Sequence, residues 1–210
     1  MRKASLLIFL VLFLTASVFF GQQNPTSLTR AKKDGKWGFR NPSGTFVIAP
    51  QFDWVSRFSE GLAAVMVGNK YGFIDETGRI VIKTRYTEAG DFSEGLVRVR
   101  MGGSTVYPTG ASLTNRKDNN WQYLDKLGNT VFKIKADEVG DFSEGLASAR
   151  IIKSGSFYCG YLDKQGRWAI APQFGSCERF SQGMAKIKLL NGESRLIDTK
   201  GKIAEKPPSP

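Results

Sequence analysis

Short runs of alternating apolar and polar residues fill the chain, and one five-residue phrase separates them. Phe-Ser-Glu-Gly-Leu stands at 58–62, 92–96 and 142–146, and an altered copy, Phe-Ser-Gln-Gly-Met, stands at 180–184. Beyond each phrase glycine the second and fourth residues are apolar, whereas the third and fifth become polar after the first copy. A period of two is typical of a β-strand with one buried face. The pattern therefore predicts one such strand after each phrase.

A predicted hairpin precedes each phrase at constant spacing. One glycine lies 17 residues before each phrase glycine, and an aromatic-glycine slot lies six residues before that. The turn between them begins with Asn or Asp and ends with Gly, as at 41–44 and 75–78, which suits a type I turn closed by a left-handed glycine. A similar turn at 198–201 predicts a fifth, incomplete hairpin. The residues that mark the repeat are Trp37, Gly38, Gly44, Gly61, Tyr71, Gly72, Gly78, Gly95, Trp121, Gly128, Gly145, Gly160, Gly166 and Gly183.

The distance from each phrase to the next aromatic slot is the part of the repeat that varies. It is 11 residues after the first phrase, 27 after the second and 15 after the third. Insertions that collect in one loop are expected when each repeat is one packed block. The longest insertion, 101–119, is rich in Gly, Ser, Thr and Asn, and a loop of this length is typical either of a functional segment or of a disordered one.

These patterns predict an all-β fold over residues 34–204, with four complete three-stranded antiparallel units and a partial fifth. A repeat this short buries its apolar face against its neighbours, so the units must stack into an array. A propeller-like ring and an open solenoid both satisfy that requirement.

Several motifs resemble the WG-repeat family, also called KWG repeats. The likeness rests on Lys-Trp-Gly-Phe at 36–39, Lys-Tyr-Gly-Phe-Ile-Asp at 70–75, Ile-Ala-Pro-Gln-Phe at 48–52 and the phrases, and it covers about 34–204. The resemblance implies a bacterial β-rich repeat module, often carried by exported or surface proteins, with no established enzymatic activity and a role in binding. The positions that depart from the pattern are Gln122 in unit three, and Cys159 and Tyr161 in unit four.

Both ends of the chain lie outside the repeats. Residues 1–21 begin with a basic pair and continue with an apolar run, which predicts a secretory signal peptide. A membrane anchor is the alternative, although the apolar run of about 15 residues is shorter than the ~20 that a spanning helix needs. We predict that residues 22–33 form a flexible lead-in and that residues 205–210 form a disordered proline-rich tail. The expected location is periplasmic, cell-surface or extracellular, with no stable membrane span after signal cleavage.

The amino-acid composition limits the partners and the kinds of catalytic or metal site that are expected of the chain. The 210 residues are 41% apolar and 23% charged, which is enough for a core, and the net charge is +11. Arg2 and Lys3 lie in the signal segment, so the remaining chain carries +9. A basic balance favours acidic partners such as anionic polysaccharide, nucleic acid or anionic lipid. Histidine is absent from the sequence, which excludes His-assisted nucleophilic catalysis and His-based zinc sites.

Stacking in register would bring basic residues of successive units into line. The residues of this predicted basic stripe are Arg98, Arg100, Arg150, Lys186 and Lys188. Such a stripe would suit an anionic polymer, with binding that weakens steeply as salt rises. The interpretation that we favour is a solvated face whose cations discourage edge-to-edge strand pairing.

Repeated aromatic residues and carboxylates have structural explanations. Aromatic side chains at constant repeat positions are more typical of packing between units than of stacking platforms for sugars or bases. Trp54 has no aromatic counterpart in the other units, and it is the best candidate for an exposed binding aromatic. Glu60, Glu94, Glu144 and the turn aspartates could serve acid–base catalysis or calcium binding, but capping hydrogen bonds explain them more simply. We therefore predict no catalytic residue, metal site or cofactor.

Cys159 and Cys177 are the two cysteines of the sequence and lie 18 residues apart in unit four. In an oxidising compartment an even pair usually joins, so a disulfide is predicted, with two small buried residues as the alternative.

The predicted function is that of an exported, non-catalytic repeat scaffold that binds a protein partner at the cell envelope. Binding of an anionic envelope polymer or glycan through the basic stripe is the alternative, and an unrecognised enzyme is third. Nucleic acid is not expected as a partner.

Overall fold

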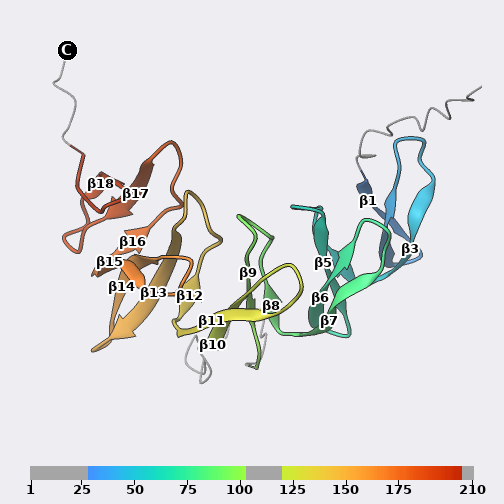
Figure 1. Cartoon of the computed structure of the whole chain (residues 1–210), viewed down its shortest axis with the longest axis horizontal. Coiled ribbons are helices and arrows are strands. Elements are labelled where there is room, and N and C mark those ends of the chain that lie inside the picture. The colour runs from blue at the N-terminus through green and yellow to red at the C-terminus, as the bar shows by residue number, and fades with distance from the viewer. Residues whose placement is uncertain (1–27, 103–119, 205–210) are drawn as a thin grey trace, which may run out of the picture.

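The computed structural model describes residues 28–102 and 120–204, and this part of the chain is all β. Its strands form five small antiparallel sheets that follow one another in chain order (Figure 1). The predicted signal peptide, most of the long insertion and the predicted tail lie outside the described residues. Among the described residues no helix is long and apolar enough to cross a membrane.

We number the sheets I to V. Sheet I contains β1 (Thr29–Lys33), β2 (Lys36–Arg40) and β3 (Phe46–Phe52). Sheet II contains β4 (Trp54–Val55), β5 (Leu62–Val67), β6 (Lys70–Asp75) and β7 (Ile80–Tyr86). Sheet III contains β8 (Glu88–Ala89), β9 (Val97–Arg100), β10 (Asn120–Leu124) and β11 (Thr130–Lys135). Sheet IV contains β12 (Glu138–Val139), β13 (Ala147–Lys153), β14 (Ser156–Leu162) and β15 (Trp168–Phe174). Sheet V contains β16 (Ser176–Cys177), β17 (Met184–Lys188) and β18 (Ser194–Asp198).

The sheets are offset from the sequence repeats. The strand after each phrase pairs with the aromatic-glycine strand of the next unit, as when β5 pairs with β6 through Val65 opposite Gly72. Tight turns join these two strands where the loop is short, and a short loop favours antiparallel pairing of the strands that it connects. Each sequence repeat therefore contributes strands to two sheets, so every repeat links two neighbouring sheets through the backbone.

The five sheets form an open row. Sheet I (blue) and sheet V (red) lie at opposite ends of the row in Figure 1. The row is curved and does not close into a ring, so among the described residues sheets I and V each have only one neighbouring sheet.

The core is divided among the four joints between neighbouring sheets. At the joint between sheets II and III, for example, Ala64 and Phe73 pack against Phe92 and Val97. Tyr123 and Tyr161 are fully buried, and each donates its hydroxyl hydrogen across a joint to a backbone oxygen, of Gly140 at 2.6 Å and Glu178 at 2.7 Å. Burial also raises the pKa of both phenols above their usual range. The aromatic residues at these repeat positions are core residues.

Residues 29–33, which the sequence assigned to a flexible lead-in, instead form strand β1. All five of its residues pair with β2, from Thr29 opposite Arg40 to Lys33 opposite Lys36. Asp34 and Gly35 close the hairpin with φ of 50° and 80°, which is the conformation of a type I′ turn. Asp-Gly between two short runs is a strong hairpin signal, and the polar composition of β1 concealed it.

The glycine of the aromatic-glycine slot has a steric role. A Cβ on Gly72 would lie 2.4 Å from the carbonyl oxygen of Ile82, because the partner strand bulges against this position. Gly38 and Gly160 are equally constrained. In sheet III the register is continuous past Gln122, which pairs with Lys133, so the bulge is absent where the glycine is absent.

Candidate functional site

Each phrase forms a tight turn with an unusual backbone. In the first copy, Ser59 and Leu62 exchange two backbone hydrogen bonds around Glu60 and Gly61, whose φ angles are 52° and 84°. Positive φ at both central residues is the type I′ turn, in which glutamate is an uncommon first residue. The reason that glutamate occupies this position lies in its contacts outside the turn.

That reason is a ladder of hydrogen bonds from one phrase to the next. Each phrase serine donates to the phenylalanine carbonyl of the following phrase, and each following glycine N–H donates to the phrase glutamate. The serine bonds are Ser59 to Phe92 at 2.7 Å, Ser93 to Phe142 at 2.7 Å and Ser143 to Phe180 at 2.8 Å. The glycine bonds are Gly95 to Glu60 at 3.0 Å, Gly145 to Glu94 at 3.0 Å and Gly183 to Glu144 at 2.8 Å. We call this set of contacts the ladder.

Two lysines reinforce the ladder from the hairpin turns. Lys126 lies 3.1 Å from the Glu60 carboxylate, and Lys164 lies 3.1 Å from that of Glu94. Partial burial acts to raise the pKa of Glu60, but the hydrogen bonds from Lys126 and the Gly95 N–H outweigh it and leave this pKa below its usual value. The pKa of Glu94 is lowered in the same way. The carboxylates of Glu60 and Glu94 therefore bind groups of the neighbouring sheet and stabilise the contact between sheets.

The turn aspartates cap their own turns, as the sequence indicated. The Asp75 carboxylate accepts from the backbone N–H of Thr77 and Arg79, both at 3.0 Å. A bond from the Thr77 hydroxyl is the main reason that the pKa of Asp75 is lowered. Asp125, Asp163 and Asp198 accept the corresponding pair of backbone bonds. Within residues 28–102 and 120–204, no group of three or more Cys, Asp or Glu side chains is placed to hold a metal ion.

Phrase turns and capped turns lie at the same ends of the strands, as the contacts of Lys126 and Lys164 show. We call this side the ladder face. The hairpin loops that join β1 to β2, β5 to β6, β9 to β10, β13 to β14 and β17 to β18 leave the opposite ends of the strands, and we call that side the loop face. All of the length variation between repeats therefore falls on the loop face.

The hairpin of β13 and β14 has an apolar tip on the loop face. Ile152 and Phe157 are opposite each other in the register and are 51% and 50% exposed. The Arg150 guanidinium lies 5.0 Å from the Phe157 ring centroid, a cation–π contact. We call Ile152 and Phe157 the hairpin tip.

The residues of the predicted basic stripe face different surroundings. Arg98 pairs with Asp141 at 2.8 Å across the joint between sheets III and IV. Arg100 pairs with Glu88, and Arg150 with Glu138. Lys186 and Lys188 are exposed on β17, which belongs to the last sheet of the row. Three of the five cations thus have acidic partners, and the structure does not bring the five together as one exposed stripe.

Edge protection does not explain these cations either, because β9, β13 and β17 are interior strands of their sheets. The third residue after the phrase glycine faces the following sheet in sheets II and III, where Ala64 packs at the joint with sheet III and Arg98 pairs with Asp141. Trp54 is 37% exposed and packs edge-to-face on Tyr71, with ring centroids 5.8 Å apart. It therefore presents only part of its ring to solvent.

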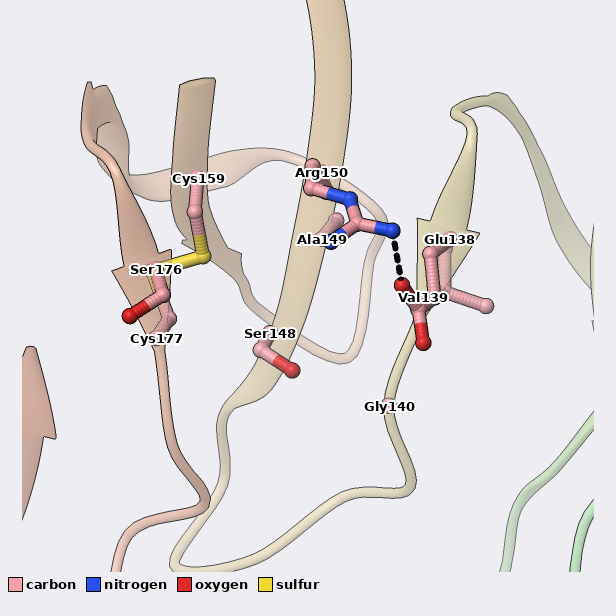
Figure 2. Close-up of a pocket in the computed structure, with 9 residues that line it drawn as sticks. All are labelled: Glu138, Val139, Gly140, Ser148, Ala149, Arg150, Cys159, Ser176 and Cys177. Atoms are coloured by element: carbon pink, nitrogen blue, oxygen red, sulfur yellow. Dashed lines mark ion pairs between the residues drawn. A yellow bond between two sulfur atoms is a disulfide. The ribbon is translucent and has the colours of Figure 1, made fainter. Parts of the chain in front are cut away.

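A cavity of about 230 Å³ lies at the joint between sheets IV and V (Figure 2). In Figure 2 the Cys159–Cys177 disulfide closes one side, and the ion pair of Arg150 with Glu138 closes the other. Ser148 lies between them on β13. The disulfide joins β14 to β16 and is therefore a covalent link between the two sheets.

The recurrence seen in the structure coincides with a known repeat. The profile of the WG-containing repeat matches four times, at residues 37–71, 71–104, 121–151 and 160–192, which is more than half of the chain. The chain belongs to the WG-containing repeat family. No curated protein sequence matches it.

Solved structures with a similar arrangement share little sequence with this WG-repeat chain. The computationally designed Ika8 protein has a TM-score of 0.47 at 14% identity, with 86% of this chain and 60% of that protein covered. BamB from Moraxella catarrhalis has a TM-score of 0.46 at 9% identity, with 85% and 60% covered. HIRA residues 644–1017 have a TM-score of 0.42 at 9% identity, with 72% and 52% covered. The chain thus spans about 60% of the length of the first two.

Proposed function

We propose that this WG-repeat chain is a non-catalytic scaffold that binds a protein partner through its loop face, with the hairpin tip as the anchor. The observation that carries the proposal is the exposure of Ile152 and Phe157 on the longest described hairpin of that face. Exposed apolar side chains with an arginine beside them are typical of the centres of protein interfaces. Repeat arrays also commonly bind on the face where their insertions collect.

A protein partner fits this surface better than an anionic polymer does. A polymer site needs a row of free cations, whereas Arg98, Arg100 and Arg150 are neutralised by acidic side chains. The tip instead offers apolar area, which a polysaccharide chain would leave largely unburied. Binding through the tip would therefore depend weakly on salt.

We further propose that the scaffold works outside the cytoplasm, at the cell envelope. The Cys159–Cys177 disulfide supports this location, because disulfides persist in oxidising compartments and are rare in the cytosol. The apolar run in residues 1–21 is the expected export signal.

A capture experiment with matched variants tests the proposal. The chain from residue 22 onward is immobilised and exposed to native envelope extract at low and high salt. We expect a protein to be retained at both salt concentrations by the unmodified chain, and to be lost with Ile152→Ser/Phe157→Ser. The control is Leu127→Ser, since Leu127 is 78% exposed on the ladder face. Capture that survives the tip substitutions, or that consists of polysaccharide released by salt, would overturn the proposal.

A further inference from the structure

The cavity between sheets IV and V lies where the preceding joint is filled by a tryptophan. In sheet III, Trp121 is opposite Arg100 in the register, and the ring centroid lies 5.2 Å from the guanidinium carbon. In sheet IV the corresponding pair is Cys159 opposite Arg150. The arginine is therefore present at both joints, whereas the indole ring of Trp121 is replaced by the sulfur of Cys159.

A second substitution enlarges the same space. Arg98, the third residue after its phrase glycine, reaches across the joint to Asp141 and lies 5.7 Å from the Trp121 ring. Its counterpart in sheet IV is Ser148, whose short side chain lines the cavity. The pair of smaller residues, Cys159 and Ser148, accounts for a cavity at this joint.

The size of the cavity points to a single side chain as its occupant. At about 230 Å³ it is smaller than the roughly 300–1,000 Å³ typical of small-molecule sites. Its charge is balanced, because Arg150 is paired with Glu138, so a free anion would gain little there. An aromatic ring would contact the guanidinium and the disulfide sulfur, both favourable partners for a π system. The hydroxyl of Ser148 and the carboxylate of Glu138 would accept a hydrogen from an indole N–H or a phenol O–H.

We propose that the cavity receives a tryptophan or tyrosine side chain of the protein partner, and this inference rests on the proposed function. The inserted ring takes the place beside Arg150 that Trp121 takes beside Arg100. The hairpin tip and the cavity share Arg150, since the same guanidinium contacts Phe157 and lines the cavity. One partner surface therefore covers the tip and fills the cavity, as buried aromatic anchors do at interface centres.

The cavity is tested first with a small probe. N-acetyl-tryptophanamide is titrated into the isotope-labelled chain from residue 22 onward, and amide shifts are followed by NMR, with N-acetyl-leucinamide as the comparison. We expect saturable shifts centred on Ser148, Arg150 and Cys177, at a dissociation constant on the order of 1–10 mM. Equal shifts with the leucine amide, or shifts located elsewhere, would overturn the proposal.

Two variants fill the cavity by different routes. Cys159→Trp/Cys177→Val reproduces the Trp121 and Val139 pair of the preceding joint, and Ser148→Leu fills the space while keeping the disulfide. Each should weaken probe binding by roughly tenfold or more. Cys159→Ser/Cys177→Ser removes the disulfide without filling the space and should retain the probe. Binding that persists in both filled variants would overturn the proposal.

Partner capture separates this inference from the function on which it rests. Ser148→Leu should reduce capture of the partner while leaving the fold unchanged. If tip substitutions abolish capture but Ser148→Leu does not, the cavity proposal fails and the proposed function stands. If no protein depends on the tip, the proposed function fails, and with it the claim that a partner fills the cavity.

Discussion

The two faces of the array are built from the same strands and differ in what joins the strand ends. On the ladder face, every phrase is hydrogen-bonded to the next, and the spacing between repeat positions is constant. On the loop face, the hairpin loops are tied mainly to their own sheets, and their length varies. One set of strand ends therefore maintains the array, which leaves the loops at the other set free to vary in length.

The physical reason lies in the cost of an insertion. An added residue in a phrase turn would displace the glycine N–H, the glutamate and the serine of that phrase. Each of these groups bonds to a neighbouring sheet, so the ladder bonds at that turn would be lost. An added residue in a hairpin loop changes only the entropy of closing that loop, which grows slowly with length. Segments that diversify for binding are therefore expected on the loop face.

The largest expected effect comes from placing the same insertion on each face. Gly-Ser inserted between Glu94 and Gly95 would break the bonds from Gly95 to Glu60 and from Gly145 to Glu94, and should cost about 3 kcal/mol or more. Gly-Ser inserted between Gly68 and Asn69 should cost about 1 kcal/mol or less. Denaturant unfolding of both variants measures the difference. Equal losses of stability would remove the distinction between the faces.

The disulfide fixes the joint between sheets IV and V independently of the ladder. Removing it with Cys159→Ser/Cys177→Ser should lower the free energy of unfolding by roughly 3 kcal/mol, since the bond closes a loop of 18 residues. Thermal or denaturant unfolding with and without reductant provides the control. Reductant should destabilise the unmodified chain and leave the serine variant unchanged; a variant as stable as the oxidised chain would contradict the expectation.

The smallest expected effect is the pH dependence of the ladder face. The folded-state pKa values of Glu60 and Glu94 are lowered, so their contribution is present above their ordinary pKa of about 4.5 and is lost as the pH falls through the folded value. Glu60→Gln/Glu94→Gln should lower stability at pH 7 by about 1 kcal/mol or less and flatten its fall below about pH 5.

The control for this pH measurement is Glu76→Gln, because Glu76 is an exposed residue of a turn on the same face. It should leave the profile of stability against pH nearly unchanged. An equal flattening in Glu76→Gln would mean that the ladder carboxylates have no special part in acid stability.

Local features of the site could be predicted where the interacting residues are close in sequence. Asp75 caps its own turn through Thr77 and Arg79, and such contacts follow from turn chemistry alone. The ladder bond from Ser93 to Phe142 spans 49 residues, and nothing in either phrase indicates which neighbour it meets. The sequence therefore indicates a capping role for Glu94 in its own turn, whereas its carboxylate bonds to the next phrase turn.

The basic stripe failed to form as one surface for the same reason. Alternation along β9 correctly places Arg98 and Arg100 on one side of the strand, but it says nothing about what that side faces. It faces the next sheet, where Asp141 stands 43 residues later. For Trp54 the sequence shows only the lack of an aromatic counterpart, whereas the exposure of its ring depends on Tyr71 beside it.

The all-β class, the repeat positions, the capped turns and the confinement of length variation to one loop all follow from the sequence. Each of these depends on backbone conformation and side-chain alternation over a few residues, which local sequence controls. The open row, the offset of sheets from repeats, the ladder and the cavity at the last joint are visible in the folded chain alone. Those features arise where sheets meet, and the residues that meet there are separated by a whole repeat, so their contacts depend on the geometry of stacking.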